Sequence, residues 1–104
     1  MADDKRYNGW TNYETWAVKL WIDNEEPSYS YWREQAENWQ RVPEHYAHDQ
    51  SPRPPMHSLG AQLKDEFFNM APDLGTTVWA DLLTAALAEV NWDEIAKSML
   101  EDLE

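Results

Sequence analysis

Residues 90–103, VNWDEIAKSMLEDL, combine a helix start signal with a helical spacing of apolar residues. Asn91 is followed three residues later by Glu94, as in a capping box, and Val90 and Ile95 occupy the two positions of a hydrophobic staple. The apolar residues then recur every three or four positions, and these are Trp92, Ile95, Ala96, Met99, Leu100 and Leu103. The pattern predicts a helix that begins after Asn91, with only a short turn before it.

Two further helices are predicted upstream of this turn. One begins after Thr76 or Thr77 and runs to about Glu89, and the other covers roughly Pro55–Met70 and ends at the sequence APDLG, residues 71–75. The apolar stripe of the later helix consists of Trp79, Leu82, Leu83, Ala86 and Val90. The residues expected to face inward from the earlier helix are Met56, Leu59, Leu63, Phe67 and Met70.

The N-terminal half predicts two more helices. Thr11 and Glu14 fit a capping box with Thr11 as N-cap, which starts a helix that runs to about Asn24. The next helix starts at the sequence EPS, residues 26–28, and runs to about Arg41. The first helix has a core stripe of Tyr13, Trp16, Ala17, Leu20 and Asn24, widened by Val18, Trp21 and Ile22, and a narrow polar stripe of Asn12, Thr15, Lys19 and Asp23. The second helix has one face formed by Tyr29, Trp32, Ala36 and Trp39.

These elements predict one all-α domain over residues 1–104, compact and built from about five helices. Residues 1–10 form a polar arm that ends in an Asn8-Gly9 turn signal, and residues 43–55 form a Pro- and His-rich connection with a short helical turn at Glu44–His48. Five tryptophans fall on apolar helical faces and are expected in the core: Trp16, Trp32, Trp39, Trp79 and Trp92. Of these, Trp16 and Trp92 are expected to be structurally essential.

Composition excludes several classes of protein. The chain has no cysteine, so disulfide frameworks, thiolate metal sites and Cys nucleophiles are excluded. Its N-terminus is polar without a following apolar run, and no stretch approaches the ~18 apolar residues of a membrane span. The simplest expectation is a cytoplasmic protein that does not bind membranes.

The residues with catalytic or metal-binding chemistry do not form a recognisable site. His45, His48 and His57 lie near Asp49, and a His-x-x-His pair on a helical turn is one way to hold Zn²⁺, but solvated loop histidines explain the same pattern. No nucleophile motif, dinucleotide-binding motif or P-loop is present. We therefore expect no enzyme activity, no cofactor and no metal, with a small metal-dependent enzyme that uses the histidine segment as the third-ranked alternative.

Charge is the strongest functional signal. The net charge is −12, and residues 65–104 hold ten acidic residues against one base, Lys97. Such a chain repels nucleic acid and attracts basic protein surfaces, so the leading hypothesis is a non-enzymatic, acidic interaction protein or nucleic-acid mimic that binds a basic, nucleic-acid-handling host protein. The candidate binding residues are Asp81, Glu89, Asp93, Glu94, Glu101, Asp102 and Glu104, with Trp10 and Tyr13 as secondary candidates. The alternative is a structural or regulatory module that self-associates, for example as a homodimer, and whose charge serves solubility.

Two sequence motifs carry a family resemblance. The sequence YNGWTNYETW at 7–16, followed by Leu20-Trp21 and Asp23-Asn24, resembles the start of a family of small uncharacterised proteins of bacteriophages, plasmids and bacterial genomes. Residues 81–83 and the sequence VNWDEIA at 90–96 resemble the C-terminal pattern of the same family. The resemblance implies a mobile-element context and no mechanism. By analogy of size and charge with inhibitors of host defence, the sharpest form of the leading hypothesis is an anti-CRISPR or anti-restriction protein.

Overall fold

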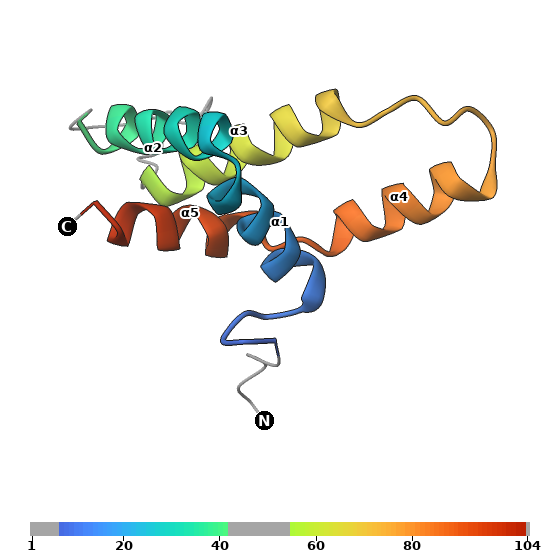
Figure 1. Ribbon diagram of the computed structural model, residues 1–104, viewed down its shortest axis with the longest axis horizontal. Helices are drawn as coiled ribbons and strands as arrows, with labels where there is room; N and C mark the ends of the chain where they lie inside the picture. Colours follow the sequence, from blue (N-terminus) through green and yellow to red (C-terminus); the bar gives the residue numbers. More distant parts are fainter. Residues whose placement is uncertain (1–6, 42–54, 104) are drawn as a thin grey trace, which may run out of the picture.

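The computed structural model describes residues 7–41 and 55–103, which contain five α-helices and no strand (Figure 1). The helices are α1 (Tyr13–Asn24), α2 (Glu26–Arg41), α3 (Pro55–Met70), α4 (Val78–Glu89) and α5 (Trp92–Glu101). The prediction of an all-α fold with about five helices is confirmed. The predictions for residues 1–6 and 42–54, including the helical turn at Glu44–His48, lie outside the described residues.

The core forms where α5 packs against α3, with α1 and α2 covering the same region. Ile95 and Ala96 of α5 and Leu59 and Leu63 of α3 are fully buried, as the apolar spacing of both helices predicts. The buried apolar residues are Ile22, Trp32, Ala36, Leu59, Leu63, Val90, Trp92, Ile95, Ala96 and Met99. The cap of α5 is also the predicted one, because the side chain of Asn91 accepts a hydrogen bond of 3.0 Å from the amide of Glu94.

Helices α3 and α5 approach each other closely at Gly60, which is buried. A Cβ atom at this position would overlap the Asp93 carboxylate and would lie 3.3 Å from the backbone nitrogen and Cα of the same residue. The lack of a side chain at residue 60 therefore allows the two helix backbones to approach each other.

The N-cap of α1 differs from the predicted one. Asn12, not Thr11, is the N-cap, and its side chain accepts a hydrogen bond of 2.9 Å from the amide of Thr15. The amide of Thr11 instead donates to the Glu94 carboxylate at 3.2 Å, so this residue serves a contact with α5. The helix begins one residue later than the capping-box pattern indicates, because Asn is as good an N-cap as Thr and a tertiary contact occupies Thr11.

The face that α1 turns toward the core is also not the predicted one. Thr15 and Lys19 of the predicted polar stripe are buried together with Ile22, whereas Tyr13, Leu20 and Trp21 of the apolar set are exposed. Hydrogen bonds explain the difference for Thr15, since its hydroxyl donates to Asn12 Oδ1 at 2.6 Å and accepts from the amide of Asn91 at 2.8 Å. Lys19 is buried with its ammonium 2.7 Å from the carboxylate of Asp23. Polar groups thus join α1 to the start of α5.

Helix α4 extends away from the other helices, and none of its residues is buried (Figure 1). The prediction that Trp79 belongs to the core is therefore wrong, as is the inward orientation predicted for Met70 at the end of α3. The segment 71–77 carries the chain away from the core, and the main contacts of α4 are with α1. One of them is a hydrogen bond of 2.7 Å from the Asn12 side chain to the carbonyl of Glu89.

Of the two tryptophans expected to be essential, the structure buries one. Trp92 lies in the core with its ring 5.6 Å from that of Phe67, so its predicted place in the core is confirmed. Trp16 is half-buried and packs instead against Tyr7 and Tyr13 with tilted rings, at ring-centroid distances of 5.6 and 5.5 Å. The core prediction for Trp16 is therefore wrong, because its side chain faces the N-terminal arm and not the α3–α5 contact.

Candidate interaction surfaces

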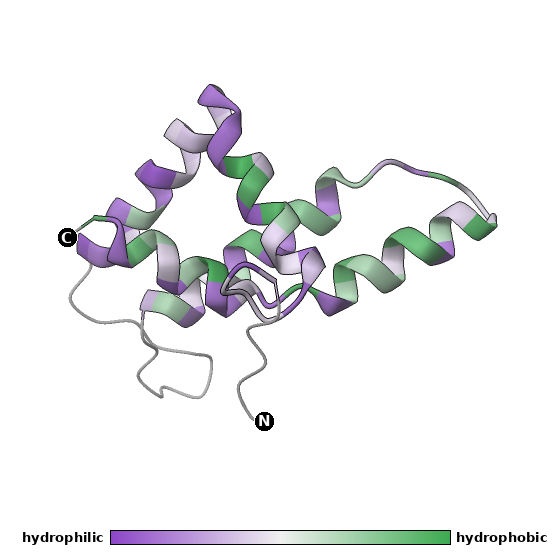
Figure 2. Ribbon diagram, turned by 60° about the horizontal axis from the view of Figure 1, so that its bottom comes forward, coloured by the Kyte–Doolittle hydropathy of each residue, from purple (hydrophilic) through white to green (hydrophobic). Residues whose placement is uncertain are grey.

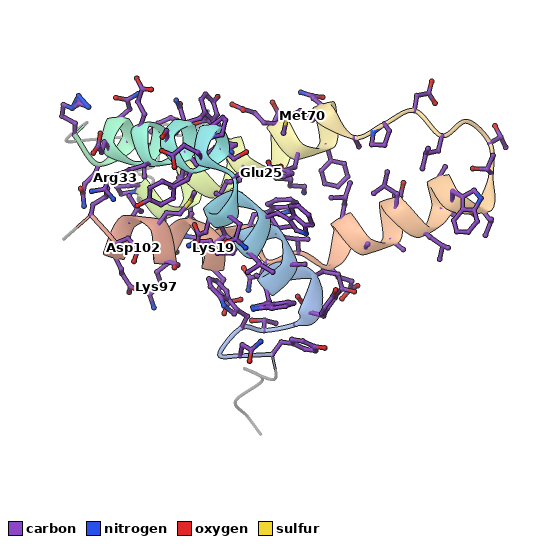
Figure 3. The ribbon with its side chains drawn as sticks, viewed as in Figure 1. Lys19, Glu25, Arg33, Met70, Lys97 and Asp102 are labelled. Atoms are coloured by element: carbon purple, nitrogen blue, oxygen red, sulfur yellow. The ribbon has the colours of Figure 1, made fainter. Side chains whose placement is uncertain are left out.

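The C-terminal end of α5 carries two exposed acidic residues, Glu101 and Asp102. The helix runs to Glu101 and has no basic residue in its last turn, so both carboxylates lie near the negative end of the helix dipole. Figure 3 shows Asp102 on the same side of the molecule as Lys19 of α1, whose ammonium is 3.9 Å from the Asp102 carboxylate. The Glu101 side chain has no ion pair or hydrogen bond in the part of the chain that the structure describes. Glu101 is thus the less compensated of the two charges.

The acidic residues at the start of α5 have structural partners. The Asp93 carboxylate lies 2.6 Å from Nδ1 of His57 on α3, and the Glu94 carboxylate accepts the hydrogen bond from the amide of Thr11. Both carboxylates also lie at the positive end of the helix dipole, which favours them. Their presence is therefore explained by stability, and the contacts with His57 and Thr11 are the part of this explanation that the sequence alone does not show.

A surface depression brings the secondary candidate Trp10 next to two of the primary ones. It is lined by Gly9, Trp10, Glu94, Lys97, Ser98 and Glu101. Trp10 is held there by a tight turn in which the amides and carbonyls of Tyr7 and Trp10 pair at 3.1 and 2.8 Å. Asn8 and Gly9 form the turn with φ angles of 51° and 90°, which confirms the Asn-Gly turn signal. The depression presents an indole and carboxylates on one surface.

The other candidates lie elsewhere. Tyr13 is exposed beside Tyr7 and Trp16 at the start of α1. Asp81 and Glu89 are exposed on α4, which leaves the turn at Val90 in the direction opposite to α5 (Figure 1). The short turn therefore does not place the acids of α4 beside those at the end of α5. Glu104 lies outside the described residues.

An exposed apolar surface is the feature that sequence reasoning missed. It is formed by the last turn of α3, the following segment and the first turns of α4. We name it the α3–α4 surface, and its residues are Phe68, Met70, Leu74, Val78, Trp79 and Leu82. Figure 2 shows hydrophobic residues along the length of α4, and Figure 3 shows Met70 at the end of α3. The sequence does contain an indication of this surface, because only three of the twelve residues of α4 are polar. A helix that is apolar on more than one side is expected to pack against more than one other element.

Chemical groups for catalysis are sparse in the described residues. No group of three or more His, Asp or Glu side chains is placed to hold a metal ion there, and His45, His48 and Asp49 lie outside this part of the chain. Partial burial, together with a hydrogen bond of 2.9 Å from its hydroxyl to the Glu66 carboxylate, raises the pKa of Tyr31. This contact joins α2 to α3 on the surface and indicates no reactive group.

Comparisons with known proteins place the chain in a family without giving it an activity. Among residues 7–41 and 55–103, no helix is long and apolar enough to cross a membrane. No curated protein and no solved structure matches the sequence. A family model does match over residues 3–104, which is nearly the whole chain, and the chain therefore belongs to the family of unknown function DUF7249.

Proposed function

We propose that this protein is a non-enzymatic interaction protein that binds a basic surface of a partner protein through the exposed end of α5. The observation that supports the proposal most directly is Glu101. Its carboxylate has no ion pair or hydrogen bond among residues 7–41 and 55–103, and it lies in the last turn of a helix, where the dipole disfavours a negative charge by ~0.3–1 kcal/mol. A charge kept against local stability is a candidate for a role in binding.

The depression beside Glu101 indicates what the partner supplies. An indole next to carboxylates suits an arginine side chain, because the guanidinium stacks on an aromatic ring and pairs with carboxylate oxygens. Trp10 and Glu101 offer these two groups, and Glu94 contributes a further carboxylate to the lining. We infer that arginine residues of the partner bind here.

The specific form of the proposal is inhibition by competition with nucleic acid. Proteins that handle nucleic acid have basic surfaces that release counterions from phosphates, and an acidic protein competes for the same surface. The net charge of −12 supports this form. An anti-CRISPR or anti-restriction inhibitor of phage or plasmid origin, acting in the cytoplasm without binding nucleic acid itself, is the class that fits.

The test compares two charge reversals of equal size. Glu101→Lys changes the proposed site, and Asp65→Lys makes the same charge change on the exposed surface of α3. Glu94 is left unchanged, because its carboxylate holds the amide of Thr11. Parent and variants are immobilised, exposed to bacterial lysate and eluted with increasing salt, and each retained basic protein is purified and assayed for binding to labelled duplex DNA.

We expect the parent and Asp65→Lys to retain the same basic protein, to lose it as salt rises and to displace DNA from it. Glu101→Lys should retain it weakly. Equal retention and equal DNA displacement by Glu101→Lys would show that this end of α5 is not the binding surface. Retention that does not weaken with salt would contradict an electrostatic interaction.

A further inference from the structure

The α3–α4 surface is unusually exposed for large apolar side chains. The exposed fraction is 61 % for Val78, 66 % for Trp79, 56 % for Leu82 and 62 % for Met70. These residues belong to two consecutive elements, the end of α3 and the start of α4, and are separated by a segment that adds a further exposed leucine. The exposed apolar side chains thus follow one another along consecutive segments of the chain.

Helix α4 gains little stability from burial, and its attachment to the other helices consists of contacts with α1 and the partly buried Leu87. It has 12 residues and no buried side chain, and isolated helices of this length are marginal in water. The capping bond from the amide of Ala80 to the Thr77 hydroxyl, at 3.2 Å, supports only its first turn. Most helices of this size gain their stability by packing an apolar face against another element, and the outward side of α4 has no such partner in the described chain.

The exposed area matches what one half of a dimer interface requires. Six apolar side chains, each between about a third and two thirds exposed, leave on the order of 500 Å² of apolar surface in water. A standard interface buries ~800 Å² per partner, and homodimer interfaces are ~65 % apolar, which also gives roughly 500 Å² of apolar surface per partner. The largest apolar patches of ordinary monomers are ~300–600 Å², and they are often functional.

The charge of this part of the chain excludes some of the partners that an exposed apolar surface could bind. No basic residue occurs between residues 65 and 96, so an anionic membrane or a nucleic acid would be repelled. The outward side of α4 carries Val78, Leu82 and Ala85 at helical spacing, and Asp81 and Glu89 are the only acids of the helix. Asp81 and Glu89 lie on this same side, three or four residues from Val78 and Ala85, so an antiparallel two-fold contact centred on Leu82 and Ala85 keeps the apolar residues together and places the two copies of Glu89 at opposite ends.

We propose that two copies of this chain associate through the α3–α4 surface, with α4 of each copy packed against α4 of the other around a two-fold axis. Leu82 and Ala85 lie near the centre of this contact. Val78, Trp79 and Met70 contribute at its edges. This association does not depend on the acidic end of α5 and has the opposite salt dependence, because salt screens the repulsion between two negatively charged copies.

The first experiment measures mass in solution by sedimentation velocity over a range of protein concentrations. The parent should approach twice the 12.3 kDa of one chain, and more readily at higher salt. Leu82→Glu should raise the dimer dissociation constant by roughly 100-fold or more, because each dimer then buries two carboxylates. Leu20→Glu makes the same change at an exposed position of α1 and should leave the mass unchanged.

The second experiment uses the absence of cysteine from the chain. Ala85→Cys places one thiol on the proposed two-fold contact, where the two Cα atoms should be within the ~4.4–6.8 Å that a disulfide spans. Mild oxidation should give a covalent dimer, whereas Leu20→Cys should remain monomeric on a denaturing gel. Circular dichroism of each variant confirms that the helices are intact.

Three results would overturn the proposal. The first is a parent protein that sediments as a monomer at every concentration. The second is a Leu82→Glu variant that dissociates no more than Leu20→Glu, and the third is an Ala85→Cys variant that is dimeric but does not cross-link. The failure of the acidic interaction affects none of these readouts, since Glu101 lies outside the α3–α4 surface.

Discussion

Replacing Gly60 by alanine tests the close approach of α3 and α5. Helix propensity alone favours the substitution, because alanine is better than glycine by ~1 kcal/mol in a helix interior. In the structure, however, the new Cβ would overlap the carboxylate of Asp93 and would lie 3.3 Å from its backbone nitrogen and Cα. Propensity and packing therefore predict opposite signs for the change in unfolding free energy.

The size of the change in unfolding free energy depends on which groups must move to make room for the new Cβ atom. The Asp93 side chain has to turn away, which breaks its 2.6 Å contact with His57, a partly exposed pair that contributes ~0.2–1 kcal/mol. The backbone contact adds an overpacking cost of about 1–3 kcal/mol, because neither helix can shift alone without disturbing the core. After the gain of ~1 kcal/mol in propensity is subtracted, these contributions leave about 0.2–3 kcal/mol, so we expect Gly60→Ala to lower the unfolding free energy by about 1–2 kcal/mol, the middle of this range.

Urea denaturation followed by far-ultraviolet circular dichroism measures the effect. Ala61→Gly is the matched control, since residue 61 is exposed on the same helix and should lose only the ~1 kcal/mol of propensity. In an Asp93→Ala background, the cost of Gly60→Ala should fall, because the carboxylate no longer occupies the space. A Gly60→Ala protein as stable as the parent, or more stable, would refute the close packing of α3 on α5.

Three other predictions follow from the packing. Trp92→Ala should cost about 3–5 kcal/mol of unfolding free energy in urea titrations, whereas the half-buried Trp16→Ala should cost clearly less. Asn12→Ala removes the cap, at a cost of ~0.5–2 kcal/mol, and also the 2.7 Å hydrogen bond to the Glu89 carbonyl. Asn12→Asp keeps the cap and loses only that hydrogen bond, so Asn12→Ala should have the lower melting temperature. Burial and a neighbouring carboxylate raise the pKa of Tyr31 above 10.0, so the parent should lose stability as pH rises through this range, because the unfolded chain releases the proton first. Urea titrations across that range should show no such loss for Tyr31→Phe, and parallel curves for the two proteins would contradict the prediction.

Helices α3 and α5 could be predicted in detail because their apolar residues match their surroundings. Met99 follows Ile95 and Ala96 by four and three residues, with polar residues between them, and all three are buried in the structure. Leu59 and Leu63 show the same agreement on α3. Where one face of a helix meets the core and the other meets water, spacing alone identifies the buried face.

Helix α1 shows where this reasoning fails. Its apolar residues surround most of the helix, so spacing did not identify a single buried face, and the polar Thr15 and Lys19 were assigned to the surface. Thr15 is buried because its hydroxyl meets the amide of Asn91, which is 76 residues away in the chain. A hydrogen bond between distant segments is not visible in local sequence, and it reversed the orientation of the helix.

The acidic residues show a similar limit for the candidate site. Sequence gives the sign and number of charges, but the positions of compensating groups depend on the fold. Lys19 comes from α1 to lie beside Asp102, and His57 comes from α3 to contact Asp93. Only the assembled structure distinguishes Glu101, which has no such partner in the described residues, from the neighbouring acids.

The arrangement of α4 and α5 allows both proposed surfaces to be used at once. The two helices leave the turn at Val90 in opposite directions, so a two-fold contact through α4 would place the acidic ends of α5 far from the dimer axis (Figure 1). A dimer would then present two binding surfaces for a basic partner, and a partner with two matching sites would be bound more tightly than by either surface alone. Leu82→Glu should consequently weaken retention of such a partner even though Glu101 and Trp10 are unchanged. Unchanged retention by this monomeric variant would show that each copy binds independently.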